Sequence, residues 1–177
     1  MTSPQIKVLV VDDSEAIIRL LTTAFSSHSI TCAGSGKEAL RLLLKDDFAV
    51  ILLDVRMPDM DGFHTAELIR LSERAKDIPL IFLTGYEVDY AQMRRAFQLG
   101  AVDFIQKPFD IEALKAKIEV FAQIYRKQLE MQKQAQQMSE TNSSLTDTNR
   151  RLLKQHRELE EKIAKLEQES CGQFQNL

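Results

Sequence analysis

Short apolar segments alternate with longer amphipathic ones through the first 125 residues, and this alternation restricts the possible folds more than any other feature. Most of the apolar runs contain almost no polar residue, as expected for strands that are buried on both faces. The expected strands are residues 6–11, 29–33, 50–53, 80–83 and 102–105, and the expected helices are residues 15–25, 37–44, 64–71, 90–99 and 111 onward. This pattern indicates an α/β fold with a doubly wound, five-stranded parallel sheet.

Composition divides the chain into two parts near residue 125. Residues 1–125 contain all four prolines and five of the six glycines, whereas residues 126–177 contain no proline. We therefore predict a globular domain at residues 1–125 and a helical segment at residues 126–177. The formal net charge of −3 disfavours general nucleic-acid binding, and no apolar stretch reaches the roughly 20 residues of a membrane span. Two cysteines and no signal peptide are typical of a reducing, cytoplasmic location.

Polar residues follow the predicted strands at their carboxyl ends, where ligands bind in doubly wound sheets. They are Asp12 and Asp13 after the first strand, Asp54 after the third, Thr84 after the fourth and Lys107 after the fifth. A single aspartate after a strand is often only a helix cap. Three carboxylates at one edge, however, repel one another and favour a hard cation such as Mg²⁺. An aspartate can also attack phosphorus, and a lysine and a hydroxyl suit a phosphoryl group.

Four segments carry a specific resemblance, namely VLVVDDSE, ILLDVRMPDMDG, IFLTGY and GAVDFIQKPF, in this order within about residues 5–125. They resemble the receiver domain of two-component response regulators. The resemblance implies that Asp54 is the phosphoacceptor and that a histidine kinase or a histidine phosphotransfer protein supplies the phosphoryl group. It implies no enzyme activity beyond self-catalysed phosphoryl transfer and dephosphorylation at that residue. It also implies a Mg²⁺ site made by Asp12, Asp13, Asp54 and the backbone carbonyl of Arg56.

The resemblance further implies a conformational switch beside the phosphoacceptor. Lys107 would pair with the phosphoryl oxygens, and its peptide bond to Pro108 would be cis. Thr84 would move to bind the phosphoryl group, and Phe104 would turn inward into the space that this movement vacates. The alternatives are that Thr84 only caps the next turn and that Phe104 is a permanent core residue.

Side chains around the predicted pocket are interpreted as follows. Arg56 lies two residues after the acceptor, and Tyr86 lies two residues after the switch threonine. The resemblance to receivers implies that these two positions tune the rate of phosphoryl hydrolysis. The sequence does not give the direction of this effect. Residues 57–62 are expected to form a loop that ends in a glycine suited to a positive φ. His28 and His64 are expected at the surface, since no metal or phosphotransfer cluster surrounds either in the sequence.

A single heptad register extends from the last helix of the globular part through the tail. The d positions are Ile124, Met131, Met138, Leu145, Leu152, Leu159 and Leu166, and the a positions include Asn142, Asn149, His156 and Ile163. This pattern predicts a long α-helical coiled coil, and asparagine at a with leucine at d favours a parallel homodimer. His156 is interpreted as a polar residue of the dimer seam and not as a phosphotransfer histidine. The alternative is a single amphipathic helix that folds back or stays solvated.

The sequence thus predicts a two-component response regulator that passes phosphorylation at Asp54 to a dimeric coiled coil, which controls an attached or recruited effector. No DNA-binding or nucleotide-binding motif follows residue 125, so no nucleic-acid partner is predicted. A second hypothesis is a constitutive dimeric scaffold with the receiver as a modulator or phosphate sink. A third is the N-terminal part of a larger histidine kinase, diguanylate cyclase or phosphatase. The sequence does not distinguish among these outputs.

Overall fold

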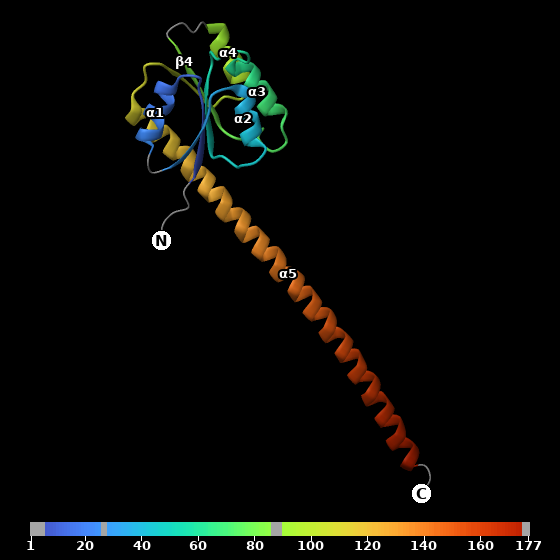
Figure 1. Cartoon of the computed structure of the whole chain (residues 1–177). Coiled ribbons are helices and arrows are strands. Elements are labelled where there is room, and N and C mark those ends of the chain that lie inside the picture. Colours follow the sequence, from blue (N-terminus) through green and yellow to red (C-terminus); the bar gives the residue numbers. More distant parts are fainter. Residues whose placement is uncertain (1–5, 26–27, 86–89, 175–177) are drawn as a thin grey trace. The chain divides into compact units, whose positions relative to one another are not determined.

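A computed structural model describes residues 6–25, 28–85 and 90–174, with side chains described as far as residue 165 (Figure 1). Two compact units make up the chain, Met1–Gln128 and Leu129–Leu177. The first contains the whole sheet, and the second continues the last helix. None of the helices in the described residues is long and apolar enough to cross a membrane.

The first unit alternates strands and helices in the predicted order. Strands β1 Lys7–Val11, β2 Ser29–Ala33, β3 Val50–Asp54, β4 Leu80–Thr84 and β5 Asp103–Gln106 form one parallel sheet in the order β2-β1-β3-β4-β5. The helices are α1 Glu15–Ala24, α2 Gly36–Leu43, α3 Gly62–Leu71, α4 Tyr90–Gln98 and α5 Ile111–Phe174. The structure confirms the predicted α/β fold with a doubly wound, five-stranded parallel sheet. It also confirms the long C-terminal helix.

Hydrophobic layers on both faces of the sheet hold the first unit together. Successive residues of a strand point to opposite faces, so β1 and β3 contribute to both layers. On one face, helices α2, α3 and α4 pack Leu43, Phe63, Ile69 and Ala96 against Leu9, Val11, Ile51 and Leu53. On the other face, α1 and the first turns of α5 pack Leu21, Leu114 and Ile118 against Val8, Val10, Val50 and Leu52 (Figure 1). This double burial explains why the central strands are almost entirely apolar.

The tail, residues 129–174, is helical throughout. The predicted d positions Met131, Met138, Leu145, Leu152 and Leu159 are between 55% and 68% exposed in the single chain. An apolar stripe of this kind is unfavourable in water unless another surface covers it. The coiled coil itself stays a prediction. Leu166 lies outside the residues whose side chains are described.

The loop between β3 and α3 differs from the prediction at its glycine. Gly62 is the first residue of α3, and the left-handed backbone is found at Asp59 instead, with a φ of 65°. Glycine is required at position 62 for another reason, because a Cβ there would lie 2.1 Å from the carbonyl oxygen of Asp54. The Gly62 N–H also donates to the carbonyl oxygen of Val55 at 2.9 Å. Helix α3 therefore begins directly on the backbone that carries Asp54.

Replacing Gly62 by alanine is expected to lower the free energy of unfolding by about 1–3 kcal/mol, because a backbone carbonyl cannot move aside as a flexible side chain can. Urea denaturation followed by circular dichroism measures this change. Gly34→Ala is the matched control, since a Cβ at Gly34 meets its nearest neighbour, Oε2 of Glu38, at an ordinary 3.7 Å. Equal stability of the two variants would contradict the predicted close approach.

Candidate functional site

Strand register brings the polar residues at the strand ends together. Val11 pairs with Leu53, so the residues that follow them on adjacent strands, Asp12 and Asp54, are neighbours. On the far side of β3, Asp54 pairs with Leu83, which precedes Thr84. Because all the strands are parallel, their carboxyl ends meet at one edge of the sheet. This is the edge at which the sequence predicts the site.

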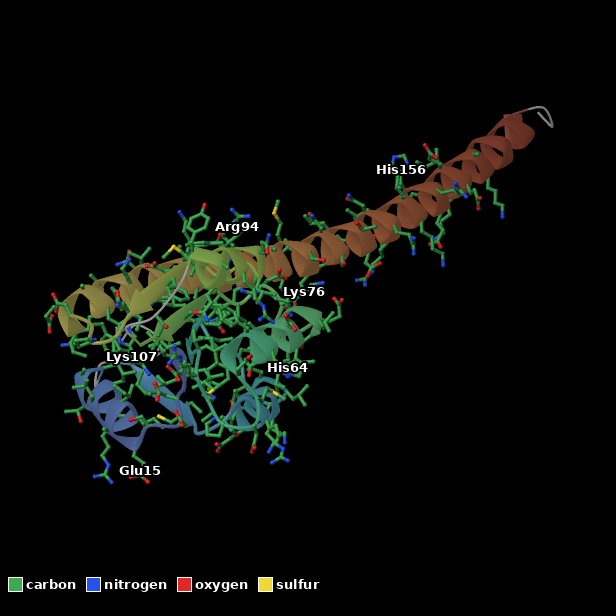
Figure 2. The ribbon with its side chains drawn as sticks, turned by 90° about the horizontal axis from the view of Figure 1, so that it is seen from above. Glu15, His64, Lys76, Arg94, Lys107 and His156 are labelled. Atoms are coloured by element: carbon green, nitrogen blue, oxygen red, sulfur yellow. The ribbon has the colours of Figure 1, made fainter. Side chains whose placement is uncertain are left out.

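Lys107, which follows β5 and is labelled in Figure 2, connects two of the carboxylates. Its Nζ donates to Oδ2 of Asp12 and to Oδ1 of Asp54, each at 2.6 Å. The remaining oxygens accept from the backbone, Oδ1 of Asp12 from Ser14 N–H at 2.9 Å and Oδ2 of Asp54 from Arg56 N–H at 3.1 Å. The Lys107–Pro108 peptide bond is cis. These contacts hold both carboxylates in fixed orientations.

Asp13 completes a cluster of three carboxylates. One oxygen from each of Asp12, Asp13 and Asp54 lies within 4.8 Å of the others. Asp12 is fully buried and Asp54 is 5% exposed, whereas Asp13 faces solvent. Water therefore reaches the cluster mainly from the side of Asp13. Three negative charges at this distance exceed the single positive charge of the Lys107 ammonium that bridges two of them.

Electrostatics follow from this imbalance. Burial raises the pKa of Asp54 above its ordinary value of 3.8, and Lys107 lowers it by a smaller amount, while Asp12 and Asp13 add to the rise. For Lys107, burial lowers the pKa, but its hydrogen bonds to Asp12 and Asp54 outweigh burial and raise it above 10.5. Lys107 is therefore a permanent cation, and the ionised form of Asp54 is destabilised in the absence of further positive charge.

The predicted switch residues lie beside this cluster. Thr84 is 2% exposed, and its hydroxyl donates a long 3.4 Å hydrogen bond to the carbonyl oxygen of Gly85. Phe104 is half-buried, with its ring centroid 6.1 Å from that of Phe82. Arg56, the first predicted tuning residue, is exposed. Tyr86, the second predicted tuning residue, lies outside the described residues.

The two histidines expected at the surface differ in the structure. His64 is exposed on α3, as predicted, but the His28 side chain is only 9% exposed. Its Nε2 lies 3.0 Å from Oε2 of Glu119 on α5, which is 91 residues away in the chain. The prediction for His28 was therefore wrong, because nothing in the local sequence indicates a partner so distant. His156 is exposed on the tail helix, next to Glu160 (Figure 2).

Comparison with known proteins agrees with this geometry. Residues 8–119 match the model of the response regulator receiver domain family. A probable chemotaxis protein CheY from Rhizobium etli is 36% identical over 118 residues, which are 65% of this chain and 91% of the relative. A probable cyclic di-GMP phosphodiesterase from Vibrio cholerae is 35% identical over 120 residues, or 67% of this chain. The match spans only 27% of the phosphodiesterase.

Solved structures show the same fold. Chemotaxis protein CheY4 of Vibrio cholerae aligns with a TM-score of 0.62 at 30% identity, over 66% of this chain and 98% of the CheY4 chain. An adenylate cyclase structure from Rhodopirellula baltica aligns with the same TM-score of 0.62 at 30% identity, over 73% of this chain and 95% of that one. Sheet order, carboxylate cluster and family match thus agree: the chain belongs to the response regulator receiver family of two-component signalling.

Proposed function

We propose that the chain is a response regulator in which Asp54 accepts a phosphoryl group from a phosphohistidine of a histidine kinase or histidine phosphotransfer protein. The observation that carries the proposal is the position of the Asp54 carboxylate, oriented by Lys107 and by the Arg56 N–H at the sheet edge. Residues 1–125 form the receiver in this proposal and residues 126–177 the output segment. A cytoplasmic location is part of it, because the relay draws its phosphoryl groups from a kinase.

The reaction is an in-line transfer to a carboxylate oxygen. An oxygen of Asp54 attacks phosphorus, the P–O bond forms, and the P–N bond to the donor imidazole breaks. The electron pair of the broken bond stays on the imidazole nitrogen, which takes up a proton. Lys107 already lies 2.6 Å from Oδ1 of Asp54, so its ammonium can follow the charge onto the new phosphoryl oxygens. Hydrolysis of the acyl phosphate returns the carboxylate.

The carboxylate cluster fits a divalent cation. Oxygen donors within 4.8 Å of one another, with more negative charge than Lys107 neutralises, are what Mg²⁺ prefers. Asp12, Asp13, Asp54 and the backbone carbonyl of Arg56 would hold the ion, whose charge would offset that of the phosphoryl oxygens. The exposed Asp13 marks the side on which the ion and the donor enter.

Phosphorylation acts on the protein through Thr84 and Phe104 in this proposal. The hydrogen bond from the Thr84 hydroxyl to the Gly85 carbonyl is long, at 3.4 Å, so a phosphoryl oxygen at a shorter distance would be a better acceptor. Phe104 is half-buried rather than locked in the core, which leaves it a second position. Together they bias the carboxyl ends of β4 and β5 between two arrangements. Arg56, and Tyr86 outside the described residues, are proposed to tune the rate at which the acyl phosphate is hydrolysed.

The tail is the output element, and we propose that it pairs in parallel with the tail of a second copy. Its apolar d positions are more than half exposed in the single chain, and burying them on a partner stabilises the pair. Asn142 and Asn149 at a positions fix the register of a parallel dimer at some cost in stability. The dimer then controls an attached or recruited effector. A constitutive scaffold is the alternative, distinguished by the measurements below.

Phosphoryl transfer is tested with phosphoramidate, a small donor that has the P–N bond of phosphohistidine. We expect one phosphoryl group per chain, detected by intact mass and removed by hydroxylamine as acyl phosphates are. Asp54→Asn should abolish labelling, and Lys107→Ala should slow it about 100-fold, the usual effect of removing a charge that stabilises the transition state. Lys115→Ala, which removes an exposed lysine paired with Glu112, is the control. Labelling of Asp54→Asn at the wild-type rate would refute the assignment.

Cation dependence of stability is the second prediction. Because the folded state raises the pKa of Asp54, the contribution of this residue to stability is lost as pH rises from about 4 through its raised folded-state pKa. Without divalent cations, Asp54→Asn should therefore be more stable than wild type at pH 7 and equal to it near pH 3.

Adding Mg²⁺ should reverse this order. At about 100 times its Kd, the ion should stabilise the wild type by about 2.7 kcal/mol and the variant by less. Thermal unfolding with EDTA and with Mg²⁺ gives both values. Asp147→Asn, on the exposed surface of the tail, is the control and should respond as wild type does. An Asp54→Asn variant that responds equally to Mg²⁺ would argue against a site at this carboxylate.

Dimerisation is tested by the solution mass from light scattering, with Mg²⁺ alone and with added fluoroberyllate as a phosphoryl mimic. We expect a dimer that Leu145→Glu converts to a monomer, because a charge would be buried at the seam. Ser144→Glu, one residue earlier on the outer face of the register, should stay dimeric. A dimer in both states means that the signal changes helix geometry, and a dimer only with fluoroberyllate means that phosphorylation assembles the seam. A monomer in both states would exclude the paired tail.

A further inference from the structure

The first turns of helix α5 pack on the core of the first unit, and these contacts end within the helix. Its apolar contacts with the sheet are made by Leu114, Ile118 and Ala122, all essentially buried. Two charged residues on either side of Ala122, Glu119 and Arg126, make the last polar contacts of the helix within the first unit that the described residues show. They are seven residues apart and so lie on the same side of an α-helix.

Three side chains form a network at this point. The Nη1 of Arg126 donates to Oε1 of Glu119 at 2.9 Å, and Nε2 of His28 lies 3.0 Å from Oε2 of the same carboxylate. Since the carboxylate only accepts, His28 donates from Nε2. His28 follows α1, where its ring packs edge-on against Phe25 at 6.4 Å between centroids. The network therefore joins α5 to the segment between α1 and β2.

Burial makes this network more than a surface ion pair. The side chains of His28, Arg126 and Glu119 are 9%, 25% and 40% exposed. The hydrogen bond from Arg126 lowers the pKa of Glu119, partial burial opposes this, and His28 adds a smaller lowering. Nε of Arg126 is buried with no acceptor among the described residues, a cost that the other contacts of the side chain offset.

The seam begins on the other side of the helix. Each residue turns an α-helix by about 100°, so Ile124, two residues from Arg126, lies roughly 200° away from it. Ile124 is 48% exposed. It is the d position from which every later d residue of the predicted seam is apolar. Between them, Tyr125 is half-buried against the core on the α1 side and lies near Asp47 and Lys7. The contacts of Arg126 and Tyr125 with the first unit thus leave Ile124 partly exposed on the other side of the helix.

We propose that His28, Glu119 and Arg126 form an anchor that sets the rotation of α5 about its own axis where the helix leaves the receiver. The anchor determines the direction in which Ile124 faces, and hence the phase in which the heptad register enters the tail. This inference rests on the proposed dimeric tail for its consequence, but not for its contacts. The three residues are positioning residues, since none of them touches the phosphoacceptor carboxylate.

Hydrogen exchange of the full chain, measured amide by amide under native conditions, tests the anchor. Glu119→Gln should speed exchange about tenfold at amides of residues 122–128, the effect expected from losing a partly buried charge-assisted hydrogen bond. Amides of β1 and β3 should exchange as before, which also shows that the variant folds. Glu112→Gln, which removes an exposed ion pair with Lys115 on the same helix, is the matched control and should change nothing at residues 122–128. Arg126→Gln is a second variant with the same expected result.

Unchanged exchange at residues 122–128 in both anchor variants would overturn the proposal. Equally faster exchange at amides throughout the first unit would also overturn it. Such a result would mean that the three residues only contribute to the global stability of the fold.

A spin label tests the consequence for the seam. The label replaces Ile124 in a chain with Cys32→Ser and Cys171→Ser, and the distance between the labels of two copies is measured. We expect a narrow distribution in the otherwise unchanged chain and a broad one with Glu119→Gln. Equal widths would overturn the link between anchor and seam. If light scattering shows only monomers, the dimer proposal fails, while hydrogen exchange still decides on the anchor.

Discussion

The ammonium group of Lys107, 2.6 Å from a carboxylate oxygen of both Asp12 and Asp54, is the interaction on which the site depends. It joins three strand ends that no local contact would bring together, and it offsets only part of their negative charge. The remaining negative charge favours a divalent cation, which in the proposed function would offset the charge of the phosphoryl group. Burial strengthens every one of these interactions, since low polarity weakens screening. The two apolar layers fix the positions of the strands whose ends form this edge.

Backbone geometry at β3 connects the site to the rest of the fold. Gly62 allows α3 to begin against the carbonyl of Asp54, and the Arg56 N–H orients the second oxygen of that carboxylate. In the proposed function, a change in charge at Asp54 would therefore act directly on the start of α3. Thr84, whose hydroxyl donates a long 3.4 Å hydrogen bond, is the neighbour to which the proposal assigns the response. At the opposite end of the sheet, the contacts of Glu119 fix the helix that leaves the domain.

The sequence predicted this architecture well because its signals are strong and local. Apolar runs such as Ile51 to Leu53 have no favourable position except between two layers, and the heptad pattern reports a helix directly. The carboxylate cluster was also predictable, since parallel strands place their ends at one edge. Gly62 was assigned to the right loop for the wrong reason. Both a close approach of two backbones and a positive φ favour glycine, so the sequence alone does not distinguish them.

Sequence alone thus determined the fold class, the long helix and the residues at the sheet edge, because each depends on periodicity or on neighbours in the chain. Only the tertiary structure decided which oxygen of each carboxylate meets Lys107 and that Asp13 is the exposed member of the cluster. It also decided that the largely covered His28 side chain contacts Glu119. These features depend on side chains that are far apart in the chain and meet only when α5 packs on the sheet. No local pattern encodes such a meeting.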